Sequence, residues 1–198
     1  MYLLCTDGVA EFDLATQRFK TLLQGNVDAI YFNEKLYIGK REEVFVYNES
    51  TGNFDLFYHL AGKNITLSCL HLDKNKNLWL GTTSNGIYCL SEDKSLSRPV
   101  TKGNITSIYE DSSNELWIGS WEEGLYRVKT DGSIENLRHN PMNTNSLCSN
   151  FVRSCCEDNS GDLWIGTFNG LNRYDRETGK FHLYTANGNS PDGLTHSS

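Results

Sequence analysis

The sequence lacks an excess of positive charge and lacks any long apolar run. Its 198 residues include 18 Lys and Arg against 25 Asp and Glu, so the net charge is −7. Nucleic-acid-binding proteins present a basic stripe, and this balance therefore argues against a nucleic-acid partner. No segment approaches the ~20 consecutive apolar residues that cross a bilayer, so we expect no membrane contact by this chain.

Motifs that carry catalysis or bind metal are also missing. The sequence contains no His-Glu-x-x-His, no Gly-x-Ser-x-Gly and no glycine-rich phosphate loop. No two of the five histidines stand at a metal-ligand spacing or at matched positions of a repeat. We therefore predict no catalytic residues, no metal site and no cofactor, and we predict that this segment is not an enzyme.

The six cysteines do not include a Cys-x-x-Cys pair. They are Cys5, Cys69, Cys89, Cys148, Cys155 and Cys156, and four of them fall in predicted strands. We interpret them as small apolar residues, with a disulfide or metal set as the alternative. Cysteine usage does not decide the cellular compartment.

Sustained helical periodicity is absent, and the sequence instead repeats one strand-type unit. Residues 163–167 are β-branched and aromatic, 168–170 have turn chemistry, and 171–174 alternate apolar and polar residues. Four earlier copies of this unit each begin with an aromatic anchor. The five anchors, spaced 35, 42, 38 and 47 residues apart, are Tyr2, Tyr37, Trp79, Trp117 and Trp164. A strand-rich repeat of this period predicts a repeat architecture.

Each unit is predicted to hold four antiparallel strands, named A to D in chain order, with the anchor on strand B. Four short strands per repeat fit an all-β propeller, in which each anchor packs on the neighbouring sheet. We therefore expect Trp79, Trp117 and Trp164 at equivalent buried positions. A two-sheet sandwich would not explain why the anchor recurs. A glycine two residues after most anchors predicts close backbone approach or a bulge at that point.

The first unit lacks strand A, and a further strand A is expected to begin at 193–198. We therefore predict one three-stranded and four four-stranded sheets, about four and three-quarter blades, as an excerpt of a seven- or eight-bladed propeller. The chain is predicted to be one partial propeller domain, 1–198, with units at approximately 1–24, 25–62, 63–102, 103–146 and 147–198.

The segment from Glu157 to Asp175 resembles the core of the two-component regulator propeller repeat, Glu-Asp-x-x-Gly-x-Leu-Trp-Ile-Gly-Thr-x-x-Gly-Leu-x-Arg-Tyr-Asp. The resemblance covers nearly the whole chain, strongly in the last three units and weakly in the first two. Such repeats form the extracytoplasmic sensor regions of hybrid two-component systems, which bind glycan fragments and signal through the membrane. The resemblance therefore implies a periplasmic sensor segment whose partners are the remaining blades and the signalling domains of a parent protein.

The B–C and D–A loops are expected to share one face, because successive connections of a meander alternate between its two ends. Loops carry recognition residues, so we predict a ligand site on this face. Trp121 is the leading candidate, because its unit already has an anchor; it would form a sugar platform with Glu122 and Glu123 as hydroxyl acceptors. The other candidate ligand-binding residues are Phe168, Asn169, His139, Arg41 and, on the innermost strand, Arg153.

Each of these candidates also has a structural interpretation. The alternative for Trp121 and Phe168 is packing on the adjacent blade. Arg153 is alternatively a solvated or locally paired arginine, and Arg41 part of a solvated turn. The connection that contains His139 has the composition of an ordinary linker.

Three functions of different classes remain open at this point. The first is a non-catalytic sensor segment that recognises an oligosaccharide. The second is a scaffold for protein–protein contact, for instance in a homodimer, and the third is a hydrolase or lyase with clustered carboxylates or a histidine metal site. An aromatic pocket on the loop face would favour the first, and a flat face with an apolar patch would favour the second.

Overall fold

The computed structural model describes residues 1–5, 8–60, 65–97 and 99–185. Within these ranges the chain consists of strands and their connections. The first B–C loop, at residues 6–7, and the further strand expected at 193–198 lie outside the described residues.

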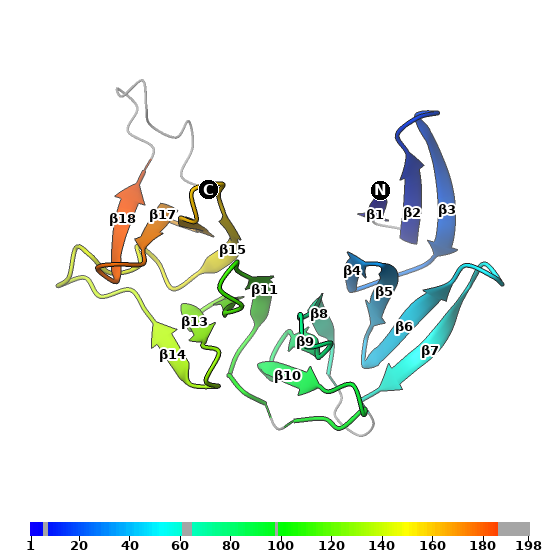
Figure 1. The fold of residues 1–198 in the computed structure, drawn as a ribbon, viewed down its shortest axis with the longest axis horizontal. Coiled ribbons are helices and arrows are strands. Elements are labelled where there is room, and N and C mark those ends of the chain that lie inside the picture. Colours follow the sequence, from blue (N-terminus) through cyan, green and yellow to red (C-terminus); the bar gives the residue numbers. More distant parts are fainter. Residues whose placement is uncertain (6–7, 61–64, 98, 186–198) are drawn as a thin grey trace.

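Eighteen strands form five antiparallel sheets that follow one another along the chain (Figure 1). The first sheet contains β1 (Tyr2–Cys5), β2 (Gly8–Asp13) and β3 (Arg18–Gln24). The second contains β4 (Ala29–Asn33), β5 (Lys35–Lys40), β6 (Glu43–Asn48) and β7 (Asn53–His59). The third contains β8 (Leu67–Leu72), β9 (Leu78–Thr82) and β10 (Ile87–Leu90). The fourth contains β11 (Ile105–Glu110), β12 (Leu116–Ser120), β13 (Leu125–Val128) and β14 (Ile134–Leu137). The fifth contains β15 (Val152–Glu157), β16 (Leu163–Thr167), β17 (Gly170–Asp175) and β18 (Lys180–Tyr184).

The sheets are arranged as successive blades around an arc (Figure 1). Strands β4, β8, β11 and β15 lie toward its centre, and neighbouring members of this set contact each other. This is the arrangement of propeller blades, in which the first strand of each sheet lies innermost. The all-β propeller prediction is confirmed.

The aromatic anchors occupy one equivalent position, as their spacing predicts. Trp79, Trp117 and Trp164 each lie second in a B strand. Trp79 and Trp117 pair with the third residue of the following C strand, Cys89 and Arg127, and Trp164 pairs with Arg173. In β17 that partner is the fourth residue, because the strand begins one residue earlier. The common register places all three tryptophans on the same face of their sheets.

Two of these tryptophans pack against the next sheet along the chain. Trp79 shares a core cluster with Leu116 and Ile118 of the fourth sheet, and Trp117 shares one with Leu163 and Ile165 of the fifth. Trp117 is fully buried and Trp79 is 8% exposed. The expectation that Trp164 is equally buried is wrong: its side chain is half-buried, since no sheet follows its own within the described residues.

The glycine two residues after the anchor lies opposite a β-bulge, and side chains of the inner strands approach its backbone closely. A Cβ atom built on Gly119 would lie 2.5 Å from Ser107 Oγ and 2.8 Å from Val152 Cγ1. These contacts are shorter than real Cβ contacts, so a side chain at this position would push apart the inner strands of the fourth and fifth sheets. The glycine is therefore required by packing between blades.

The third sheet departs from the prediction of four strands, because the described residues after β10 form no fourth strand. The segment after β10 runs alongside it irregularly, with one bridge from Leu90 to Leu96 and backbone hydrogen bonds from Ser97 N to Cys89 O and from Val100 N to Ile87 O. Pro99 follows within this segment and has no N–H to donate, which prevents a regular ladder. The described part of the chain thus has two three-stranded and three four-stranded sheets.

All six cysteines are free thiols. Burial raises the pKa of Cys69 and of Cys155 to about 12 in each case, so both are protonated at neutral pH. The interpretation of these two residues as small apolar side chains fits that environment.

Candidate functional site

One recurrent hydrogen bond builds the loop face. The first residue of each B–C loop donates its N–H to the residue just before strand A of the same sheet. The three pairs are Thr83 to Thr66 at 3.0 Å, Trp121 to Asn104 at 2.9 Å and Phe168 to Phe151 at 3.0 Å. The D–A connection joins the same face, because Gly124 N donates to Asn150 O at 3.0 Å. The prediction that both kinds of loop share a face is therefore met by the geometry.

A hydroxyl at the end of strand B fixes each of these loops. Ser120 Oγ donates to Gly124 O at 2.9 Å and accepts from Glu123 N at 2.8 Å. Thr82 and Thr167 make the matching bonds in the third and fifth sheets. Because each loop is closed by its own hydroxyl, the residue at its start is free to vary without loss of the turn. That residue is Trp121 in the fourth sheet and Phe168 in the fifth.

Three aromatic side chains lie in a row on this face. The rings of Trp121 and Phe151 are 5.5 Å apart and nearly perpendicular, and the rings of Phe151 and Phe168 are 6.2 Å apart. Trp121 is half-buried, whereas Phe151 and Phe168 are 36% and 47% exposed. We call Trp121, Phe151 and Phe168 the aromatic row. It spans the fourth and fifth sheets, so Trp121 both packs on the adjacent blade and remains partly open to solvent.

Arg153 lies beside this row on the innermost strand of the fifth sheet. Its guanidinium carbon is 5.3 Å from the centre of the Trp121 ring, within the range of a cation–π contact. The side chain is exposed. The structure therefore brings together Trp121, Phe168 and Arg153, which lie far apart in the sequence.

The acidic residues of the Trp121 loop lie in different surroundings. Glu123 forms an ion pair with Arg138, whose other guanidinium nitrogen donates to Glu122 O at 3.3 Å. Glu122 itself has an exposed side chain. His139 follows Arg138 and donates its backbone N–H to Asn150 Oδ1 at 2.8 Å, while its ring Nδ1 lies 2.8 Å from Leu147 O. The Glu123–Arg138 pair thus ties the long D–A connection to the B–C loop, and His139 makes bonds within that connection.

Asn169 and Arg41 complete the predicted set, and they stand apart from each other. Asn169 is exposed next to Phe168, and its N–H donates to Thr167 Oγ1 at 3.2 Å. Arg41 begins the B–C loop of the second sheet, with its N–H 2.5 Å from Asp28 Oδ2. It occupies the loop position that Trp121 holds, but two sheets away. Nothing in the structure brings Arg41 to the aromatic row.

Phe151 is the member of the row that the sequence analysis missed. It directly precedes β15, where the matching residues of the third and fourth sheets are Thr66 and Asn104. An aromatic residue at a position that is polar in two other repeats was the available signal. The anchors lie on strand B and give no information about the residue before strand A.

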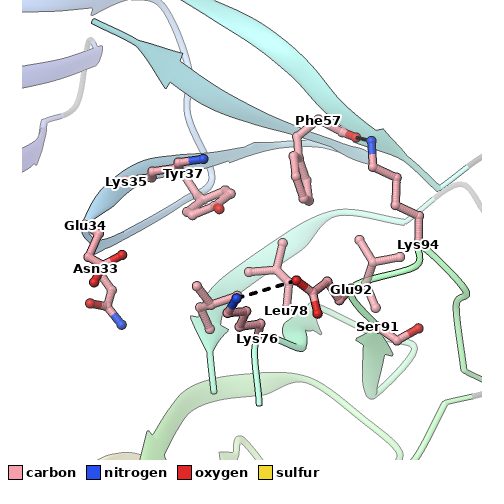
Figure 2. A pocket seen from close by; sticks show the side chains of 12 residues that line it. Asn33, Glu34, Lys35, Tyr37, Phe57, Lys76, Leu78, Ser91, Glu92 and Lys94 are labelled. Atoms are coloured by element: carbon pink, nitrogen blue, oxygen red, sulfur yellow. Dashed lines mark hydrogen bonds and ion pairs between the residues drawn. The ribbon is translucent and has the colours of Figure 1, made fainter. Parts of the chain in front are cut away.

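A hollow of about 350 Å³ lies at the opposite end of the blades, between the second and third sheets (Figure 2). Tyr37, Phe57 and Leu78 form its apolar walls, as Figure 2 shows. On its rim Lys76 and Glu92 approach to 3.6 Å, and Lys94 Nζ donates to Phe57 O at 3.3 Å. The lining charges are of both signs, and Lys76, Glu92 and Lys94 are already engaged, so this hollow specifies no ligand.

Similar hollows lie at other blade interfaces, so we attribute them to the repeated packing of the blades and not to a specific binding site. One lies beside Tyr2, between the first and second sheets, and another lies beside Trp79, between the third and fourth sheets. Between the fourth and fifth sheets large side chains occupy the matching region. Tyr174 stands there in the register position of Leu90, and Arg127 lies 5.1 Å from the Trp117 ring. We therefore place the candidate site on the loop face.

An aspartate that anchors the A–B turn is a further recurrent feature. Trp79, Trp117 and Trp164 each donate their ring N–H to the aspartate six residues earlier, at 2.8, 2.7 and 2.7 Å. These aspartates are Asp73, Asp111 and Asp158, and each also accepts backbone N–H groups of its turn. The acidic residue at the end of each A strand is thus structural and not part of a ligand site.

In the described ranges, no group of three or more His, Cys, Asp and Glu side chains is placed to hold a metal ion. A helix long and apolar enough to cross a membrane is likewise missing from the residues that the structure describes. The predictions of no enzyme activity, no cofactor and no membrane contact remain predictions.

The family model of the two-component regulator propeller matches residues 59–84, 99–122 and 146–169. These segments contain the B strands of the third, fourth and fifth sheets, including all three tryptophan anchors. A search of curated proteins found no significant match. The repeats that the sequence resembles are therefore present in the part of the chain where the resemblance is strongest.

Solved structures show the same fold. The extracellular domain of a hybrid two-component system from B. thetaiotaomicron superposes with a TM-score of 0.71 at 22% identity, over 98% of this chain and 27% of that one. Virginiamycin B lyase from Staphylococcus aureus superposes with a TM-score of 0.70 at 14% identity, over 94% and 65%. PorZ, a type-IX secretion component of Porphyromonas gingivalis, gives 0.71 at 16% identity, over 98% and 33%. This chain spans only part of the length of each, and at these identities the likeness concerns the fold alone.

Proposed function

We propose that this chain, which carries two-component regulator propeller repeats, is a non-catalytic ligand-sensing segment of a two-component sensor and recognises glycan fragments on its loop face. The sensor assignment is supported by the matched repeats and by the fold of the extracellular sensor domain. That relative is an extracellular domain, and we accordingly propose a periplasmic location. The remaining blades and the signalling domains of a parent protein would be its covalent partners.

The observation that carries the glycan proposal is the aromatic row beside Arg153. Sugar rings present a face of C–H groups, which stack on aromatic rings, and hydroxyls at their edges, which require polar partners. Trp121, Phe151 and Phe168 supply the rings, and exposed Glu122 and Asn169 supply acceptors for hydroxyls. Two sheets contribute to this surface, so a ligand of several sugar units could contact both.

Replacing Trp121 by alanine tests this proposal. In the full-length gene product we expect Trp121→Ala to weaken oligosaccharide binding at least tenfold, about 1.4 kcal/mol, because the ring that carries the stacking is removed. Calorimetry against a panel of oligosaccharides measures the affinity. Phe19→Ala is the matched control, since Phe19 is an aromatic residue, 66% exposed, on β3 of the first sheet. Unchanged affinity with a lowered melting temperature would show that Trp121 acts only as a wedge between blades.

The alternative is a scaffold for protein–protein contact, including a homodimer, and the same aromatic row favours it. Phe151 and Phe168 form an exposed apolar patch that a partner surface could cover. Sedimentation of the full-length gene product and of Phe168→Ser distinguishes the two functions. Dimers that dissociate on this substitution, without oligosaccharide binding by either form, would favour the scaffold. A hydrolase or lyase is supported only by fold likeness to the lyase, which does not determine activity.

A further inference from the structure

We propose that Arg153 makes the loop face selective for sugars that carry a negative charge, either a carboxylate or a sulfate ester. This inference rests on the proposed function, because it names the class of glycan that the aromatic row would bind.

Arg153 is the extra residue of a β-bulge at the start of the inner strand. The pairing of β15 with β16 shifts between Val152 and Ser154, and matching shifts occur at Ser68 and Thr106 in the third and fourth sheets. A bulge redirects the side chain of its extra residue. From this position the hydroxyls of Ser68 and Thr106 donate hydrogen bonds to backbone carbonyls of the next inner strand, at 2.5 and 2.7 Å. In the fifth sheet the bulge instead presents a guanidinium on the exposed surface.

Arg153 differs from the other arginines of its neighbourhood in lacking a carboxylate partner. The other four arginines of the fourth and fifth sheets each pair with an acidic side chain: Arg127 with Glu115, Arg138 with Glu123, Arg173 with Asp162, and Arg176 with Asp111 and Glu157. No acidic side chain pairs with Arg153 among residues 1–5, 8–60, 65–97 and 99–185.

The surroundings leave Arg153 available to an anion. Glu123 is the partly buried acidic residue of the adjoining loop, and its ion pair with Arg138 already neutralises it. Arg153 itself stacks over Trp121 at 5.3 Å. A guanidinium stacked through its face keeps its N–H groups in the plane of the fork, where they bind a carboxylate or sulfate with two parallel hydrogen bonds. A sugar ring on the aromatic row would place an anionic substituent at this fork.

Matched pairs of charged and uncharged glycans test the proposal with the full-length gene product. Calorimetry would compare oligogalacturonides with their methyl esters, and sulfated galactan oligosaccharides with their desulfated forms. We expect the charged member of at least one pair to bind about tenfold more tightly, and Arg153→Gln to abolish that difference between the two members of the pair. The pair that shows the preference identifies the anion as carboxylate or sulfate.

Two further variants make the outcome specific to Arg153. Arg153→Lys keeps the charge but not the planar fork, and should retain only part of the preference. Arg18→Gln removes an exposed arginine from β3 and should leave the preference intact. Equal binding of charged and uncharged glycans by the unaltered protein, or a preference that survives Arg153→Gln, would overturn this inference alone. If no glycan binds at all, the proposed function itself fails.

Discussion

Trp117→Ala is expected to lower the free energy of unfolding by about 3–5 kcal/mol, the range for alanine replacement of a fully buried tryptophan. Trp117 has no exposed surface and lies between the fourth and fifth sheets. Its ring contacts Tyr174 at 5.2 Å and Arg127 at 5.1 Å, and its N–H satisfies the buried carboxylate of Asp111. The substitution therefore removes apolar contacts, opens a cavity and deprives a carboxylate of a donor.

Trp164→Ala is the matched control for this effect. Trp164 has the same register position and the same hydrogen bond to its aspartate, but it is half-buried and packs mainly on Tyr184, at 5.3 Å. Urea denaturation of both variants measures the difference. We expect a clearly smaller loss for Trp164→Ala, because less surface returns to water. Equal losses would mean that the turn hydrogen bond, and not packing between the blades, accounts for the role of the anchor.

The sequence predicted the fold well because the anchors repeat in a common register. A blade needs a large ring at one position of strand B to fill the space before the next sheet, and this requirement is local enough to be visible at Trp79, Trp117 and Trp164. Strand count was less predictable. The fourth strand of the third sheet depends on a hydrogen-bond ladder that Pro99 interrupts, and alternation of apolar residues does not report on that ladder.

The candidate site was predicted in part, for a similar reason. Trp121 stood out because it is a second tryptophan in a unit that already has its anchor. The contact between Trp121 and Arg153 could not be foreseen, because it depends on a bulge that redirects Arg153 and on packing between two sheets. Phe151 was missed because it precedes its strand and contacts the row across the blade interface. Contacts that occur at a single blade interface, unlike the packing of the repeated anchors, leave no periodic signal.

The burial of Trp117 also depends on Asp111, which joins the fourth and fifth sheets. Its side chain is buried and accepts from the Trp117 ring N–H at 2.7 Å and from Arg176 of the fifth sheet at 2.8 Å. Its other oxygen accepts the backbone N–H groups of Ser113 and Glu115, both at 2.9 Å. Asp111→Ala leaves these donors without their acceptor, and we expect a loss of about 3 kcal/mol in the free energy of unfolding. This loss lies at the low end of the range for removing one partner of a buried ion pair, because the side chain of Arg176 is partly exposed.

Asp158→Ala is the matched control for Asp111→Ala. Asp158 makes the same bonds to Trp164 and to its own turn, but it is exposed and no arginine of a following sheet reaches it among the described residues. Water can replace its hydrogen bonds, so its removal should cost much less. Urea denaturation of the two variants under identical conditions gives the comparison. A loss for Asp158→Ala as large as for Asp111→Ala would assign the effect to the turn within one sheet and remove the link between sheets.

The same carboxylate should make stability depend on pH. Burial alone would raise the pKa of Asp111, but the hydrogen bonds from Trp117 and Glu115 and the charge of Arg176 outweigh it and lower the pKa below its ordinary value. A carboxylate whose pKa is lower in the folded than in the unfolded state contributes its full stabilisation above the unfolded pKa, about 3.9. That contribution is lost as the pH falls from there through the folded pKa. Urea denaturation at pH 6 and at pH 3 should show a smaller acid-induced loss for Asp111→Asn than for the unaltered chain, and an equal loss in both would contradict the lowered pKa.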